Sequence, residues 1–246
     1  MSNVRCITVQ HVGFAVLLVF ALLGACQGAH GQVGHRPESS PYTDLHSKKV
    51  LSLTGGILSG SSGKAGVGPG DGRYTGARFD LHLGGPASIN FGAGVANLER
   101  VVIDPTFGPD NRTVDTTSQA VLLFDGGFDL LLTGEKKWHG LIPYFGAGMG
   151  IALGTSVDAD SVSGYSFSTH FTAGPRLGVW LHPSDRITFR IETRDIIWRL
   201  KYPEGFFSTP ENEPTEPPVL DANVMKDTQW VHHLGLTLSI GYTIGS

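Results

Sequence analysis

Apolar and polar residues alternate along most of the chain, most plainly in the stretch 141–153, LIPYFGAGMGIAL. One set of alternate positions, beginning at Ile142, contains three glycines, whereas the other set, beginning at Pro143, is wholly apolar. Because successive side chains of a strand point to opposite faces, this stretch is predicted to be a strand. Glycines at this density would each cost about 1 kcal/mol in a helix. The length suits a tilted strand that crosses a bilayer, which needs about 9–11 residues.

Seven further segments show the same alternation, and connections rich in turn-forming residues separate them. In the last segment, apolar residues from Leu234 to Ile244 alternate with glycine, serine and threonine. The weakest alternation is in the first segment. The eight predicted strands are 48–59, 73–84, 87–98, 119–133, 141–153, 165–182, 186–199 and 230–244.

The connections between these strands alternate in length, with long ones in the first, third, fifth and seventh places and short ones between. Membrane barrels with short periplasmic turns and longer extracellular loops show this alternation, whereas a β-sandwich has no reason to produce it. The predicted fold is therefore all-β, an eight-stranded antiparallel up-and-down transmembrane β-barrel that spans 48–246.

The composition of the polar faces separates a membrane barrel from a soluble barrel with an apolar ligand inside. A soluble exterior is usually rich in lysine and glutamate. Here the polar faces contain Gly, Ser, Thr, Asn, Asp and Arg, with almost no lysine. Small residues beside a few large charged ones suit the narrow lumen of an eight-stranded barrel. The polar faces are therefore expected inside and the apolar faces outside.

Four cationic and four anionic side chains share the inward parity, and we expect them to form a paired network, because unpaired buried charges would cost several kcal/mol. The glycines of 141–153 would make room for them. The alternative interpretation is that these charges lie on a solvated surface. The predicted lumen network comprises Arg78, Asp80, Asp125, Asp129, Arg176, Arg190, Glu192 and Arg194.

The four tryptophans lie near strand ends, as interface aromatics of a membrane barrel do. For Trp180 and Trp198 only their depth supports this interpretation, because their parity points inward. The predicted interface aromatics are Trp138, Trp180, Trp198 and Trp230.

Composition excludes some classes of function. Only 16% of the 246 residues are charged and the formal net charge is -4, without a basic block, so nucleic-acid binding has no electrostatic support.

The N-terminus has the pattern of an export signal. Arg5 precedes an apolar run, 12–25, which is too short for a spanning helix. Ordinary cleavage would make 1–31 the signal peptide, whereas a lipoprotein signal would end at residue 25 and place a lipid on Cys26. We expect 32–47 to be a flexible periplasmic lead-in. Because Cys6 and Cys26 both fall in or beside the signal, the mature protein is expected to lack a disulfide.

Motifs that would indicate catalysis are absent or badly placed. Gly63-Lys64 lacks the remaining residues of a phosphate-binding loop, and the paired glycines lie inside strands rather than before a helix. His232 and His233 are adjacent, so they point to opposite faces and cannot easily share a metal. Ser168 and His170 face inward, away from the acyl chains that a lipid hydrolase would cleave. We expect no enzyme activity, no cofactor and no metal.

Several segments resemble the small outer-membrane β-barrel proteins described as OmpA-like or OmpW-like transmembrane domains. The segments are PYFGAGMGI, AGPRLGVWLHPSDRITFRIETRD, which ends at Arg194-Asp195, and LGLTLSIGYTI. The resemblance implies the barrel architecture and an outer-membrane location but no activity. One departure is the C-terminus, Ile244-Gly245-Ser246, where such barrels usually carry an aromatic residue for insertion; Tyr242 is a candidate substitute.

The expected function is that of a non-enzymatic, monomeric outer-membrane protein with a charge-filled lumen and a structural or surface-interaction role. The alternative is a narrow outer-membrane channel for small solutes. The expected contacts are with outer-membrane lipid and with a surface partner through loop 201–229, which contains Phe206 and Phe207 among prolines and glutamates. The competing interpretation of this loop is a disordered acidic segment.

Overall fold

The alternating sequence folds into strands over most of its length. The computed structural model describes residues 40–46, 49–155 and 160–244. The predicted signal peptide with Cys26, most of the lead-in and the final two residues lie outside these ranges. Within them, no helix is long and apolar enough to cross a membrane.

Eight of the strands form a closed antiparallel barrel, which confirms the predicted fold class. Each strand pairs with its neighbours along the chain, and the ladder between the last strand and the first closes the cylinder. The barrel strands are β2 (Lys49–Gly60), β3 (Gly72–Gly84), β4 (Ala87–Ile103), β5 (Thr113–Leu131), β7 (Leu141–Gly154), β8 (Thr169–Leu181), β9 (Ile187–Lys201) and β10 (Thr228–Thr243).

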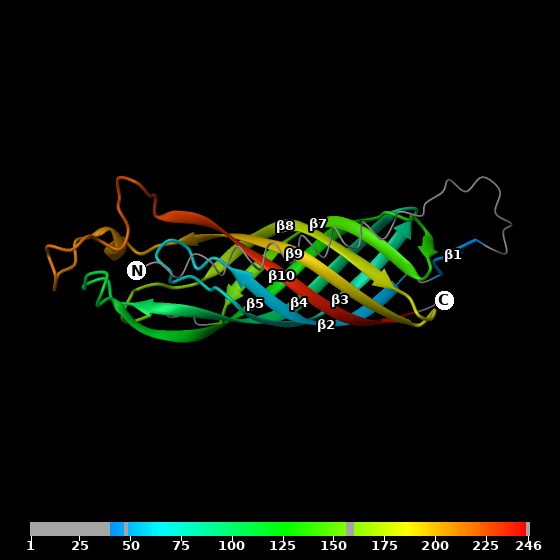
Figure 1. Cartoon of the computed structure of the whole chain (residues 1–246), viewed down its shortest axis with the longest axis horizontal. Coiled ribbons are helices and arrows are strands. Elements are labelled where there is room, and N and C mark those ends of the chain that lie inside the picture. The colour runs from blue at the N-terminus through cyan, green and yellow to red at the C-terminus, as the bar shows by residue number, and fades with distance from the viewer. Residues whose placement is uncertain (1–39, 47–48, 156–159, 245–246) are drawn as a thin grey trace. The chain divides into compact units, whose positions relative to one another are not determined.

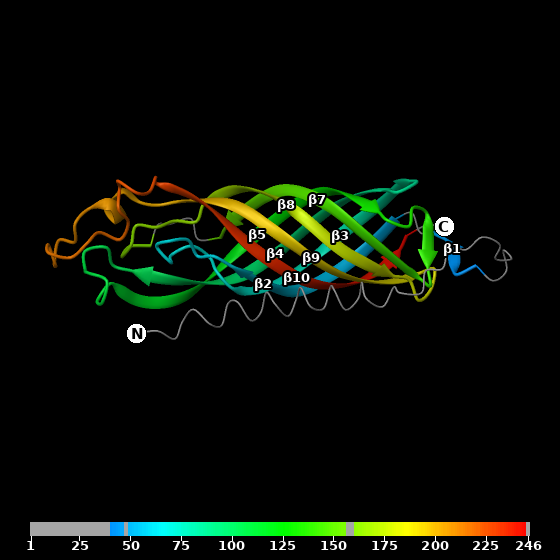
Figure 2. The ribbon, with the colours of Figure 1, turned by 45° about the horizontal axis from the view of Figure 1, so that its top comes forward.

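The barrel has two different ends (Figure 1, Figure 2). At the long-loop end lie the connections 61–71, 104–112 and 202–227, together with the described parts of the loop between β7 and β8. The short-turn end carries tight connections and two short paired strands, β1 (Tyr42–Asp44) and β6 (Lys136–Trp138). The last part of the predicted lead-in therefore forms a strand against a barrel turn.

Three element boundaries differ from the predictions by more than two residues. β4 and β5 continue past the predicted ends, and residues 99–103 pair with 113–118, because the ladder hydrogen bonds extend through this polar stretch. β8 begins at Thr169 rather than at residue 165. Phe167 consequently belongs to a loop, where it is buried instead of facing outward with Phe171.

The two faces of the barrel wall have opposite chemistry. The outward positions are apolar and exposed: on β10 the exposed residues include Leu234, Leu238 and Tyr242. The inward positions are buried and form three layers between the two ends, namely an apolar cluster, a polar layer and a second apolar cluster. Because successive side chains of a strand point to opposite faces, the apolar residues lie outside and the polar residues inside, as the sequence predicted.

Candidate functional site: ion pairs inside the barrel

The middle of the lumen contains the eight charged side chains that were predicted from parity. They project from β3, β5, β8 and β9, and each forms an ion pair with another member of the set. Six of them are buried, whereas Asp125 and Arg194 are half-buried. The alternation of the strands delivers these groups to one compartment, because every second residue points inward.

Arg78 on β3 is the centre of the network. Its Nη1 donates to Glu192 Oε2 at 2.6 Å, and its Nη2 donates to Asp129 Oδ2 at 2.6 Å. Its Nε also donates to Asp80 Oδ1 at 2.8 Å. One guanidinium therefore joins carboxylates from three strands, using the several donors that distinguish arginine from lysine.

Two further arginines extend the network from its carboxylates. Arg190 Nη1 lies 3.2 Å from Asp80 Oδ2, and Arg176 Nε lies 3.4 Å from Asp129 Oδ1. The Arg190 guanidinium also lies over the Trp180 ring, 4.8 Å from its centroid. Because Arg190 and Arg176 are buried, their ion pairs and hydrogen bonds offset part of the cost of removing their charges from water.

Two uncharged side chains that the charge pattern did not reveal, Tyr144 and Asn90, also form hydrogen bonds with the network. Tyr144 Oη donates to Glu192 Oε2 at 2.6 Å. Asn90 accepts a hydrogen bond from Arg176 Nη1 and donates one to Asp129 Oδ2, both at 2.8 Å. Inward parity was the only available signal for these two residues, and it does not distinguish them from other inward polar residues.

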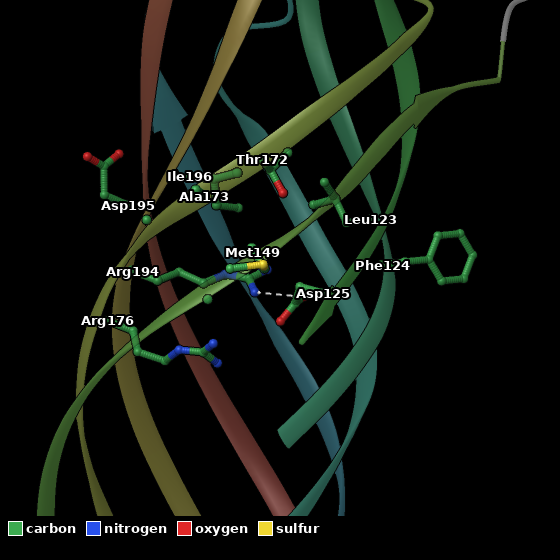
Figure 3. Close-up of a pocket in the computed structure, with 12 residues that line it drawn as sticks. Leu123, Phe124, Asp125, Met149, Thr172, Ala173, Arg176, Arg194, Asp195 and Ile196 are labelled. Atoms are coloured by element: carbon green, nitrogen blue, oxygen red, sulfur yellow. Dashed lines mark hydrogen bonds and ion pairs between the residues drawn. The ribbon is translucent and has the colours of Figure 1, made fainter. Parts of the chain in front are cut away.

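Arg194 and Asp125 form a separate pair beside the main network. Arg194 Nη1 lies 3.3 Å from Asp125 Oδ2, and its guanidinium lies over the Tyr74 ring at 4.6 Å. A pocket of about 30 Å³, lined also by Arg176, Thr172 and Leu123, adjoins this pair (Figure 3). A site for one water needs about 10–15 Å³, so the pocket has room for about two or three waters rather than for a sizeable ligand.

Glycines in the wall provide space for the network. A side chain at Gly127 or Gly148 would collide with the Arg176 guanidinium, and one at Gly146 would collide with Asp129. The side-chain atoms nearest to a Cβ at Gly146 or Gly148 belong to Asp129 and Arg176, so these glycines provide space for this pair.

Apolar side chains fill the lumen on both sides of the charges. The short-turn cluster consists of Val50, Leu131, Ile142, Tyr144 and Trp180. The long-loop cluster is larger and includes Leu98, Trp198, Tyr202, Phe206 and Leu220. The charged layer is therefore bounded by apolar packing in both directions along the barrel.

The four tryptophans divide into an exposed pair and a buried pair, and the predicted interface position is wrong for the buried pair. Trp138 and Trp230 are exposed by 40% and 59% on the outside. Trp180 and Trp198 are only 2% and 0% exposed, and each belongs to one of the two lumen clusters. Both residues occupy inward positions of their strands, and a position near a strand end does not change the face to which a side chain points.

Loop 201–229 is ordered rather than disordered. Phe206 lies in a short 3-10 helix, η2 (Glu204–Phe207), and is buried in the long-loop cluster, so it is not available for partner contact. Glu213 accepts hydrogen bonds from the Gly108 backbone N–H at 2.8 Å and from Asn111 Nδ2 at 2.7 Å. Glu213 therefore ties this loop to the connection between β4 and β5.

The neighbouring loop carries a stabilised carboxylate, Asp160. Burial alone would raise its pKa, but backbone N–H groups of Ser163 and Val162 and the Arg100 guanidinium lower the pKa below its ordinary value. Arg100 Nη2 lies 2.9 Å from Asp160 Oδ2. This ion pair joins β4 to the loop between β7 and β8.

The adjacent histidines point to opposite faces, as their spacing predicted. His233 is buried, and its Nε2 lies 2.7 Å from the Pro69 carbonyl oxygen. His232 lies outside, with its Nδ1 2.7 Å from Asp195 Oδ2. Among the residues that the structure describes, no group of three or more metal-ligating side chains could hold a metal ion.

The arrangement defines a class of molecule: a closed eight-stranded antiparallel barrel with an apolar exterior and a charge-paired interior. Within the network the four formal positive charges cancel the four formal negative charges. Such a layer binds strands to one another across the lumen.

No protein-family model matches the chain, and no curated protein sequence matches it. Among solved structures, it is similar to Neisserial surface protein A, with 12% identity and a TM-score of 0.47 over 83% of this chain and 98% of that one. It is also similar to the N-terminal β-barrel domain of Pseudomonas aeruginosa OprF, with 11% identity and a TM-score of 0.43 over 80% and 98%. A third similar structure is Ail, the attachment invasion locus protein of Yersinia pestis, with 10% identity and a TM-score of 0.36 over 80% and 99%.

Proposed function

We propose that this chain is a non-enzymatic outer-membrane β-barrel protein with a structural or surface-interaction role. Its long-loop end would face the outside of the cell, and its short-turn end would face the periplasm. The observation that carries the proposal is the apolar outer wall. Exposed Leu, Ile, Phe and Met side chains cover a continuous surface over several strands, far more than a soluble monomer exposes.

The height of the apolar wall fits a membrane. On β10 the outward residues from Leu234 to Tyr242 are large, mostly aliphatic and about half exposed. At about 3.3 Å per residue and a tilt of about 40°, the eight residue steps of this stretch span about 20 Å along the barrel axis. The apolar band of outer-membrane barrels is about 25 Å tall.

The filled lumen supports a structural role over the alternative of a narrow channel. A path along the axis would have to cross the short-turn cluster, the ion pairs around Arg78 and the long-loop cluster. The pocket near Arg194 has a volume of only about 30 Å³ and adjoins one side of the charged layer. We therefore expect no steady open current in planar bilayers.

The ordered loops support the surface-interaction role. Loops 104–112 and 202–227 are joined through Asn212, whose backbone N–H donates to the Thr106 carbonyl oxygen at 2.9 Å, and through Glu213. A fixed platform loses less conformational entropy on binding than a disordered loop does. The exposed side of this platform is the proposed contact region for a partner.

Placing a charge on the outer wall tests the membrane assignment. Leu238 is 61% exposed near the middle of the apolar band, so Leu238→Arg would be tolerated on a soluble barrel. In a lipid-facing position, arginine at the bilayer midplane costs about 2–4 kcal/mol. We expect Leu238→Arg to lower strongly the amount of heat-modifiable protein in the outer-membrane fraction. Val224→Arg, in an exposed loop, should leave this amount unchanged.

Two results would contradict the proposal. Equal tolerance of Leu238→Arg and Val224→Arg, with protein in the soluble fraction, would remove the membrane assignment. A steady single-channel current from the wild-type barrel would instead favour the channel function.

A further inference from the structure

A small basic and aromatic patch lies on the outer wall at the long-loop ends of β9 and β10. It consists of Arg199, Lys201, Trp230 and His232, which all have outward parity and are exposed. Trp230 is directly opposite Arg199 in the ladder between the two strands. The four side chains therefore form one contiguous surface on the barrel.

The patch begins where the apolar band ends. Along β10 the outward residues are aliphatic or aromatic from Tyr242 to Leu234, and the next outward residues are His232 and Trp230. If the barrel spans a membrane as proposed, this position is the level of the lipid headgroups, where tryptophan rings are favoured. The patch thus faces headgroups rather than acyl chains.

The two cations of the patch have no acidic partner. Within the described part of the chain, neither Arg199 nor Lys201 forms an ion pair, and Arg199 Nη2 donates only to the Thr228 hydroxyl. The nearest outward carboxylate, Asp195, is engaged by His232. On β5, β8 and after β7, the residues at the corresponding edge are the uncharged Ser118, Thr169 and Thr155. Arg199 and Lys201 therefore place two exposed cations beside one tryptophan, whereas β3 carries a single exposed arginine, Arg73, near its long-loop end.

We propose that this basic and aromatic patch binds the phosphate of an anionic membrane lipid, an inference that rests on the proposed membrane location. Arg199 supplies a planar guanidinium that can grip a phosphate with two N–H groups, and Lys201 supplies a second, mobile cation. Trp230 packs beside the glycerol and upper acyl region. An anionic lipid so held would fix the depth and rotation of β9 and β10 in the bilayer.

The experiment uses the full mature barrel in nanodiscs of phosphatidylcholine containing an equal amount of phosphatidylglycerol with the same acyl chains. Native mass spectrometry counts the lipids of each kind that remain bound after the disc is removed. The test variant is Arg199→Gln with Lys201→Gln. The matched control is Arg73→Gln with Lys136→Gln, which removes the same charge from exposed residues elsewhere.

We expect the wild-type protein to retain phosphatidylglycerol in preference to phosphatidylcholine. Because each cation near an anionic surface contributes about a fivefold factor, the test variant should lose about tenfold or more of the retained phosphatidylglycerol. The control and Arg199→Lys should retain most of it. No preference in the wild type, or equal losses in test and control variants, would overturn the proposal.

The same samples separate this inference from the proposed function. Failure of the membrane assignment would appear as protein that does not enter the discs at all. Failure of the lipid site alone would appear as inserted, heat-modifiable barrel that shows no selectivity for the anionic lipid.

Discussion

Arg78 and Glu192, 114 residues apart in the sequence, meet across the lumen at 2.6 Å and are both buried. The same guanidinium also holds Asp80 and Asp129. Arg78 therefore connects β3 to β5 and β9, strands that are not all neighbours in the barrel wall. Backbone ladders close the cylinder, and this side chain crosses its interior.

Removal of the Arg78 guanidinium should destabilise the barrel strongly. Arg78→Met leaves three carboxylates buried without their shared partner, and we expect the free energy of unfolding to fall by about 3–5 kcal/mol. Urea unfolding in detergent, followed by the heat-modifiable gel shift, measures the change. The control Arg73→Met alters an exposed arginine on the same strand and should change stability by no more than about 0.5 kcal/mol. Similar effects of the two substitutions would contradict the central role of Arg78.

A methyl group at Gly148 should disturb the network from the wall. The added Cβ would lie 3.1 Å from Arg176 Cζ, 3.2 Å from the Gly126 carbonyl oxygen, and closer still to Arg176 Nη2. We expect Gly148→Ala to lower stability by about 1–3 kcal/mol in the same unfolding assay. Gly55→Ala is the control, because a Cβ at this position meets nothing within 4 Å. This substitution lowers the conformational entropy of the unfolded chain, so it should leave stability unchanged or raise it. A harmless Gly148→Ala would show that Arg176 has other space available.

Stability should fall in mild acid because of His182, in the turn between β8 and β9. Burial, Lys137 and His82 lower the pKa of His182 from 6.5 to about 4. The unfolded chain therefore binds a proton more readily than the folded one, so this contribution to stability is complete above pH 6.5 and is lost as the pH falls toward 4. Each pKa unit corresponds to about 1.4 kcal/mol.

Unfolding at pH 7.5, 6, 5 and 4 measures this slope. His182→Gln should flatten the part of the slope between pH 6.5 and 4, whereas His46→Gln, in an exposed position, should leave it as in the wild type. An unchanged slope in His182→Gln would assign the acid sensitivity to other groups.

Lipids should quench only two of the four tryptophans. Trp138 and Trp230 face outward, whereas Trp180 and Trp198 lie inside the barrel wall. In vesicles with brominated lipids, Trp138→Phe and Trp230→Phe should each remove part of the quenchable fluorescence, and Trp180→Phe and Trp198→Phe should remove almost none. Strong quenching that disappears in Trp198→Phe would place this ring at the lipid surface and contradict its buried position.

The sequence by itself determined the eight barrel strands, their antiparallel order and, within those strands, the side of the wall that a side chain occupies; Phe167, which lies before β8, is outside this rule. It could do so because the side-chain period of a strand is two and does not depend on distant contacts. Parity thus placed Arg78, Arg176 and Glu192 together inside, and the alternation of connection lengths distinguished the two ends.

Only the tertiary structure decided which inward residues meet. The register of the ladders sets the height of each side chain in the lumen, and a period of two contains no information about height. This is why the contacts of Tyr144 with Glu192 and of Asn90 with Asp129 were not foreseen. For the same reason, depth alone misplaced Trp198, whose ring packs 4.1 Å from His233 inside the barrel. Loop 202–227 also depended on tertiary contacts, because its order comes from burying Phe206 and from hydrogen bonds to residues about 100 positions away, a separation that local composition does not encode.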